Sequence, residues 1–185
     1  MSTTILTLVG SLREGSINKQ LAEAAELHAP SGVSVITYGA LDALPFYNED
    51  IDNDVDRPKP VDDLRAAATE ADALLLVSPE YNGSMPAVLK NAIDWLSRPY
   101  GEGALKGLPA AVVGSAFGQF GGVWAHDEGR RSLGVAGATV LEDAKLSIGG
   151  SITRFADQHP KDDAEVTGAM TAVLVTLATA AAVAA

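Results

Sequence analysis

The sequence predicts an α/β fold in which helices cover both faces of one parallel sheet of five strands. Short apolar runs alternate along the chain with segments whose apolar positions recur at helical spacing. Strands that alternate with helices imply parallel strands joined by right-handed crossovers. The 185 residues suit a single domain spanning 1–185, and neither a repeat nor a linker divides the chain.

The first elements set the pattern. Residues 4–9 form an apolar strand that ends at Gly10, and Ile17, Leu21, Ala24 and Ala25 then recur on one face of a helix. The breakers in 29–32 end that helix before the second strand. The expected strands are 4–9, 33–38, 73–78, 110–114 and a short one near 139–141. The expected helices are 17–28, 61–71, 85–98, about 122–135 and about 166–185.

This order of elements favours a flavodoxin-like doubly wound sheet with strand order 2-1-3-4-5 over a six-stranded dinucleotide-binding sheet. Ligands of such sheets bind beyond the carboxyl ends of the strands, where the strand order reverses. For this order the reversal lies between strands one and three. The segments after Val9 and Ser78 are therefore the first places to look for a site.

The last helix, 166–185, is almost uncharged and about as long as a membrane span. It consists mainly of Ala and Thr, which contribute little to insertion, and no basic cluster flanks it. We expect a buried or half-buried helix that closes the fold, and no membrane association.

Composition excludes several classes of function. The chain has no cysteine, which rules out disulfides, a thiolate nucleophile and cysteine-bound metal, and which favours a cytoplasmic location. The net charge of −11 argues against a nucleic-acid-binding surface. His28, His126 and His159 are scattered along the chain, so we expect no metal site.

The segment after the first strand is rich in donors for a phosphate. Ser11, Ser16 and Asn18 offer side-chain donors, Arg13 offers a charged fork, and the helix that opens at Ile17 adds its backbone N–H groups and dipole. A helix cap alone explains Ser16 but not the other donors.

The spacing narrows the kind of phosphate. Ser16 stands where a Walker loop has its lysine, and Ile17 stands where that loop has Ser or Thr, so nucleoside triphosphate chemistry is not expected. Leu12 occupies the second glycine position of the dinucleotide pattern. A terminal phosphomonoester fits best.

The segment after the third strand is either a well-formed turn into a helix or part of the same site. It reads Pro79-Glu80-Tyr81-Asn82-Gly83-Ser84, and its Pro, Asn and Gly expose backbone groups to a neighbouring ligand. Taken with the first segment, it resembles the NADPH-dependent FMN reductase family, a flavodoxin-like group that includes quinone, chromate and azo-compound reductases. The motifs that carry the resemblance are 10–18, 79–84, 89–95, 105–109 and 121–122, within about residues 4–150.

The resemblance implies a bound flavin mononucleotide (FMN). It places Ser11, Arg13, Ser16 and Asn18 on the FMN phosphate, with Ile17 in the same cradle, and it places Pro79, Glu80, Tyr81, Asn82, Gly83 and Ser84 along the ribityl chain and the ring edge. A third loop, 115–122, would flank the ring through Ser115, Gly118 and Gly121.

The implied activity is the passage of hydride from NADPH, or NADH, through FMN to quinones or similar small acceptors such as flavins, azo compounds or chromate. Flavin N5 carries this chemistry, so no catalytic side chain is expected. The alternatives are a flavodoxin-type electron carrier and a flavin-free nucleotide-binding protein. The resemblance also implies a homodimer or homotetramer with the helix of Trp95 and Arg98 at the contact, although Trp95 has an equally good interpretation as core.

Overall fold

The computed structural model describes residues 2–184 and contains the expected sheet. Five parallel strands are ordered β2-β1-β3-β4-β5, as predicted. The strands are β1 (Thr3–Val9), β2 (Val33–Tyr38), β3 (Ala73–Val77), β4 (Pro109–Ser115) and β5 (Thr139–Ile148). The order reverses between β1 and β3, so the loops that follow these strands lie at the switch point.

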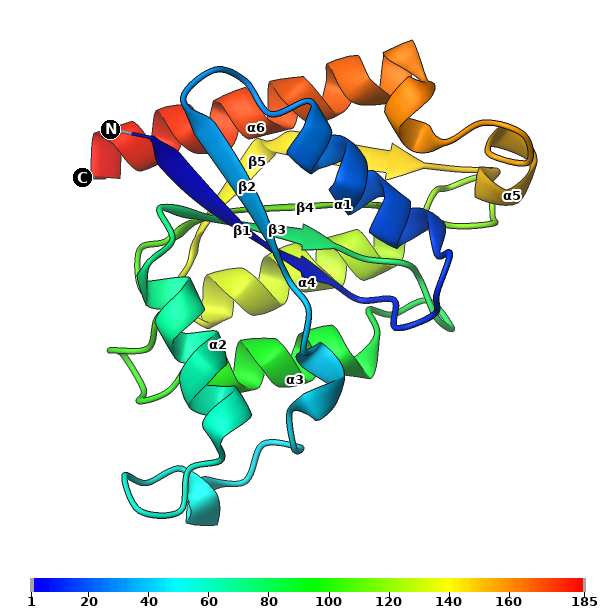
Figure 1. The fold of residues 1–185 in the computed structure, drawn as a ribbon. Helices are drawn as coiled ribbons and strands as arrows, with labels where there is room; N and C mark the ends of the chain where they lie inside the picture. The colour runs from blue at the N-terminus through cyan, green and yellow to red at the C-terminus, as the bar shows by residue number, and fades with distance from the viewer. Residues whose placement is uncertain (1, 185) are drawn as a thin grey trace.

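Helices cover both faces of the sheet (Figure 1). The helices are α1 (Ile17–Leu27), α2 (Lys59–Thr69), α3 (Ala87–Leu96), α4 (Val123–Val135), the short α5 (Ser151–Arg154) and α6 (Ala164–Ala184). In Figure 1, α1 and α6 lie above the sheet, and α2, α3 and α4 lie below it. Single 3₁₀ turns are η1 (Leu41–Ala43), η2 (Glu49–Ile51) and η3 (Pro160–Asp162).

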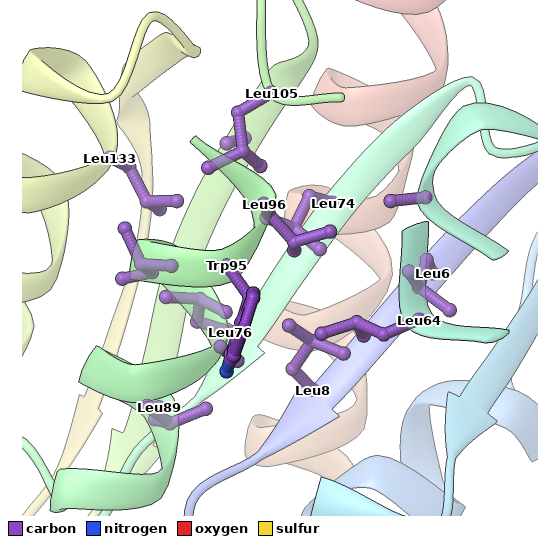
Figure 2. Packing of buried hydrophobic residues seen from close by; sticks show 14 of the residues in the cluster. Leu6, Leu8, Leu64, Leu74, Leu76, Leu89, Trp95, Leu96, Leu105 and Leu133 are labelled. Carbon is purple, nitrogen blue, oxygen red and sulfur yellow. The ribbon is translucent and has the colours of Figure 1, made fainter. Parts of the chain in front are cut away.

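Alternate residues of each inner strand point into two separate cores. Leu6 and Leu8 of β1 join the core under α2, α3 and α4, whereas Ile5 and Val9 join the core under α1 and α6. Figure 2 shows the first of these cores, in which Trp95 packs among leucines from the helices and the sheet. Full burial on both faces explains why these strands appear in the sequence as continuous apolar runs.

Trp95 of α3 is a core residue. Its side chain is fully buried, it packs edge-on against Tyr47 with ring centroids 4.9 Å apart, and its Nε1 donates to the Pro45 carbonyl at 2.8 Å. The structure therefore favours the core interpretation, and Trp95 offers no surface to a second subunit.

Strand β5 is longer than predicted. It runs from Thr139 to Ile148 and pairs with β4 in two parts, because Ala110 pairs with Val140 but Val112 pairs with Lys145. The extra residues form a bulge that contains Glu142 and Asp143, and these charges end the apolar run in the sequence. After the bulge the two strands pair again, from Val112 with Lys145 to Ser115 with Ile148. Strand β5 therefore ends level with β4 at the carboxyl end of the sheet.

Helix α6 packs on the sheet as expected. One stripe of its side chains is buried against the core under α1, namely Val166, Met170, Val173, Leu174, Leu177 and Ala181. The helix is also long and apolar enough to cross a membrane, but a helix that covers a core meets the same criterion. Its exposed face carries Gly168, Ala172, Val175 and Thr179.

Candidate functional site

The carboxyl ends of β1, β3 and β4 bring three loops together at one end of the sheet, at the right of Figure 1. We call them the first loop (10–16), the second loop (78–86) and the third loop (115–122). All of the predicted site residues lie on these loops or on the first turn of α1, so the fold brings them to the same end of the molecule.

The first loop has a row of free backbone donors. None of the N–H groups of 11–17 has an acceptor among residues 2–184. Ser16 caps α1, and its Oγ accepts from the Asn18 N–H at 3.2 Å. Ser11 and Ser16 are buried. A loop with free N–H groups at a helix N-terminus is a ready site for an anion.

Arg13 is exposed beside these donors. Its guanidinium makes one weak contact, at 3.4 Å from Nη1 to the Glu14 carbonyl. The side chain is therefore not held by an ion pair within the described chain. It can turn toward a phosphate at small cost.

Asn18 takes part in the site differently from the expectation. Its side chain bonds to the backbone of Ser115 with both atoms, since Nδ2 donates to the carbonyl at 3.0 Å and Oδ1 accepts from the N–H at 2.9 Å. The amide thus fixes the start of α1 to the end of β4. In this arrangement Asn18 positions the first loop, and its backbone rather than its amide lies toward the loop.

The second loop turns tightly at Asn82 and Gly83. The backbone of Tyr81 and Ser84 exchanges two hydrogen bonds of 3.0 and 3.1 Å, and the two residues between them have φ of +53° and +75°. Positive φ at both central positions is typical of a type I′ turn, which Asn-Gly favours. The N–H groups of Glu80, Asn82 and Gly83 have no acceptor in the described part of the chain.

The Glu128 side chain and the Ala125 N–H of α4 hold the second loop in place, and neither contact is predicted from the sequence. Glu128 Oε2 accepts from the Ser84 hydroxyl at 2.5 Å and from the Met85 N–H at 3.0 Å. These hydrogen bonds, with that of Ser84 the stronger, lower the pKa of Glu128. In return, Glu80 Oε2 accepts from the Ala125 N–H at 3.3 Å. The loop is attached to α4 at both ends of its turn.

His126 lies directly beneath the second loop. It is fully buried, with Nε2 at 2.9 Å from the Ser78 carbonyl and Nδ1 at 2.7 Å from Ser147 Oγ. Because a carbonyl only accepts, Nε2 carries the proton in the neutral ring. Burial lowers the pKa of this imidazole, although the bond to Ser78 acts in the opposite direction.

Gly114 makes room for this histidine. A Cβ at this position would lie 2.1 Å from the Ser78 oxygen and 2.8 Å from His126 Nε2. The role of His126 could not be predicted from the sequence, because its partners Ser78 and Ser147 are 48 and 21 residues away along the chain.

The third loop carries an unused buried hydroxyl. Ser115 Oγ has no hydrogen-bond partner among the described residues. The loop itself is pressed against the end of β5, where Gly118 accepts from Gly121 and Gly150 at 3.1 and 3.3 Å. A Cβ on Gly121 would lie 2.7 Å from the backbone of Ile148, so this approach requires glycine. Buried polar groups are normally bonded, so a ligand that reaches Ser115 would satisfy it.

A cavity of about 270 Å³ also lies beside the first loop, on the side of β2. Ser11 and Lys19 line it, together with Glu23, Glu26 and Asp42. These carboxylates suit it poorly to a phosphate, whereas the switch-point side offers the free N–H groups. Among residues 2–184, no group of three or more His, Asp or Glu side chains is placed to hold a metal ion.

The donors fit a flavin phosphate and ring better than a polyphosphate. The first loop supplies uncharged donors and one arginine for a phosphomonoester, the second supplies free N–H groups, and Ser115 supplies an unpartnered hydroxyl.

The chain matches known proteins in both sequence and fold. The model of the family described as NADPH-dependent FMN reductase matches residues 3–153. A quinone reductase from Pseudomonas putida is 38% identical over 160 residues, which cover 86% of this chain and 85% of that protein. A 2-hydroxy-1,4-benzoquinone reductase from a Burkholderia species is 45% identical over 121 residues, which cover 65% of this chain and 64% of that protein, less than two thirds of its length.

The fold also matches solved flavoenzyme structures. FerB, an NAD(P)H:(acceptor) oxidoreductase from Paracoccus denitrificans, has a TM-score of 0.75 and 28% identity, with 95% of this chain and 97% of that chain covered.

Proposed function

This chain belongs to the NADPH-dependent FMN reductase family, and from that premise we propose that its first loop holds the phosphate of FMN. The observation that carries this proposal is the row of free N–H groups from 11 to 17 beside the unpaired Arg13. The helix dipole of α1 adds a partial positive charge at the same place, and it acts against the overall charge of −11.

The other two loops would hold the rest of the cofactor. The free N–H groups of Glu80, Asn82 and Gly83 are suited to the carbonyl and nitrogen edge of the ring. Ser115 would donate its unused hydroxyl, and the third loop would flank the ring through Gly118, whose Cβ position is open, and Gly121, which packs against Ile148. Ser84 acts through Glu128, because its hydroxyl already donates there.

The chain is an NAD(P)H-dependent FMN oxidoreductase that acts on quinones. In the balanced reaction, NAD(P)H, a proton and a quinone give NAD(P)⁺ and a hydroquinone. FMN held by the three loops would supply the hydride-transfer chemistry between the nicotinamide and the acceptor. The protein binds and orients, and none of the three histidines is required as an acid or base. We propose that small quinones are the acceptors, and that flavins, azo compounds or chromate can take their place.

We also propose a homodimer or homotetramer in the cytoplasm, with 1–185 as one domain. Arg98 at the end of α3 is half-buried and lies over the Tyr47 ring at 5.4 Å, while Tyr100 beside it is exposed. With Trp95 in the core, a contact on this side would use Arg98 and Tyr100. Sedimentation of a monomer at micromolar concentration would refute the oligomer.

One experiment tests the function directly. The purified chain is titrated with FMN and its absorbance is recorded, and then NADPH or NADH is added without oxygen. Loss of the flavin absorption band with one nucleotide, followed by its return on addition of a quinone, is the expected result. A protein that binds no FMN contradicts the proposal, and a flavin that neither nucleotide reduces indicates an electron carrier instead.

A further inference from the structure

The third loop and the start of α4 expose three aromatic side chains close together in sequence. Phe117, Phe120 and Trp124 have 73%, 59% and 57% of their surface exposed. They are half of the six Phe and Trp residues of the chain. We call these three residues the aromatic patch. Isolated exposed apolar residues are ordinary, but a cluster of large aromatic side chains at the edge of a binding site is not.

The patch is held in a fixed place by the backbone. Gly118 accepts two backbone hydrogen bonds, one of them from Gly150 beyond β5. Ala116 donates to the Ile148 carbonyl at 3.1 Å, and Val123 donates to the Phe120 carbonyl at 3.3 Å. The close approach at Gly121 leaves the loop little room to move inward. The aromatic side chains are therefore displayed by a firmly anchored loop.

The rings of Phe120 and Trp124 form a tilted pair. Their centroids are 5.8 Å apart and their planes meet at 44°. Neither ring covers the face of the other, and both side chains stay more than half exposed. Faces of this kind are available to stack on a third planar ring.

The start of α4, which carries Trp124, is bonded to the second loop. The N–H of Ala125 donates to Glu80 Oε2 at 3.3 Å. Trp124 precedes one end of this bond in sequence, and Tyr81, itself half exposed, follows the other. The Trp124 end of the patch therefore lies next to the loop that we assign to the flavin ring.

We propose that Phe117, Phe120 and Trp124 form the subsite that stacks the ring of an uncharged quinonoid acceptor. This inference rests on the proposed function and adds the residues that select the acceptor. A planar uncharged ring gains from the aromatic faces, and it does not oppose the net charge of −11, as an anionic acceptor does.

Kinetics with two acceptors test the subsite. The FMN-loaded full chain is assayed with 1,4-benzoquinone and with ferricyanide, a compact anion that has no ring to stack. Each lost aromatic pair weakens binding by roughly 2- to 12-fold. In F120A/W124A we expect the KM for benzoquinone to rise by roughly 5- to 100-fold, and by a much larger factor than the KM for ferricyanide. The matched control is F46A, because Phe46 is an aromatic residue that is 81% exposed and lies between η1 and η2, outside the three loops.

Fluorescence gives a readout that does not depend on turnover. The chain has two tryptophans, and Trp95 is fully buried whereas Trp124 is exposed. Benzoquinone, without any nicotinamide, should quench the fluorescence of the FMN-loaded protein in a saturable way. The saturable part should be lost in W124F, which retains Trp95.

Several results would overturn the inference. One is an equal rise of both KM values in F120A/W124A, since it would mean that the patch supports the flavin rather than the acceptor. Another is an unchanged ratio together with a change of sedimentation, since it would make the patch a contact between subunits. A wild-type protein that oxidises neither nicotinamide with any acceptor contradicts the proposed function instead.

Discussion

The side-chain amide of Asn18 is bonded at both ends to the backbone of Ser115, 97 residues away, by hydrogen bonds of 2.9 and 3.0 Å. This pair ties the first loop to the end of β4, and both partners are buried. Among residues 2–184, it is the one contact in which a side chain from the first turn of α1 joins the proposed phosphate cradle to the third loop. The shape of the cradle should therefore depend on Asn18.

The variant N18D tests this coupling. An aspartate can accept from the Ser115 N–H but places a second oxygen against the carbonyl, so one buried acceptor is left facing another. We expect a loss of about 1–3 kcal/mol in the free energy of unfolding, measured with urea. We also expect weaker binding of FMN. N18L, which removes both bonds, should lose stability as well. Unchanged stability in both variants would show that the pair does not hold the loop.

Arg13 should contribute to FMN binding and not to folding. Its only contact in the described chain is the weak one to Glu14, so R13A has little to lose in the free protein. Hydrogen bonds to charged groups contribute about 1.5–3 kcal/mol, so we expect the Kd for FMN to rise by roughly 10- to 150-fold. R131A, on the exposed side of α4, is the matched control.

Riboflavin sharpens the same test, because it lacks the phosphate. R13A should weaken FMN binding and leave riboflavin binding as it is. If R13A lost equal affinity for FMN and riboflavin, Arg13 would contact a part of the cofactor other than the phosphate.

The sequence predicted the parts of the site that depend on neighbouring residues. Ser16 as a cap, the free donors around Arg13 and the Asn82-Gly83 turn all follow from residues within one loop. The strand order was also predicted, from the alternation of strands and helices along the chain. The site residues remain a prediction, since the donors are in place but their ligand contacts are untested.

The supporting contacts were not predictable, because each joins elements that are distant in the sequence. Glu128 reaches Ser84 across 44 residues, and His126 reaches Ser78 across 48. In the sequence, Glu128 looks like a solvent-exposed or capping residue, and His126 looks like an isolated histidine. Their roles appear only when α4 is packed against β4 and β5. The second half of β5 was not predicted either, because the charged residues of its bulge interrupt the apolar run in the sequence.

The stability of the protein should depend on pH through His126. Burial holds its pKa below the ordinary value, so the folded protein keeps the ring neutral where the unfolded chain takes up a proton. The unfolded state then binds more protons, and stability falls as the pH drops below about 6.5 until the lowered pKa is reached.

Urea unfolding at pH 7.5 and 5.5 measures this effect. The wild type should lose up to about 1.4 kcal/mol more than H126Q over this interval, because a glutamine keeps a donor near the Ser78 carbonyl without titrating. The difference between the two proteins cancels the groups that titrate in both. Equal losses would mean that His126 becomes protonated in the folded state.

Two glycine substitutions should have opposite effects. Gly114 has the Ser78 oxygen and His126 within 2.8 Å of where a Cβ would lie, so G114A forces the second loop and the histidine apart. We expect a destabilisation of at least about 1–3 kcal/mol, as for other overpacked sites, together with weaker FMN binding.

Gly168 lies on the exposed face of α6 with nothing within 4 Å of its Cβ position. There G168A should stabilise the protein by about 0.5–1 kcal/mol, because alanine has the higher helix propensity. Thermal unfolding and FMN titration of both variants test the pair. If G114A were as stable as the wild type and bound FMN equally well, then the second loop would not depend on its support by His126. Because α6 lies on the opposite face of the sheet from His126, G168A should leave the affinity for FMN unchanged.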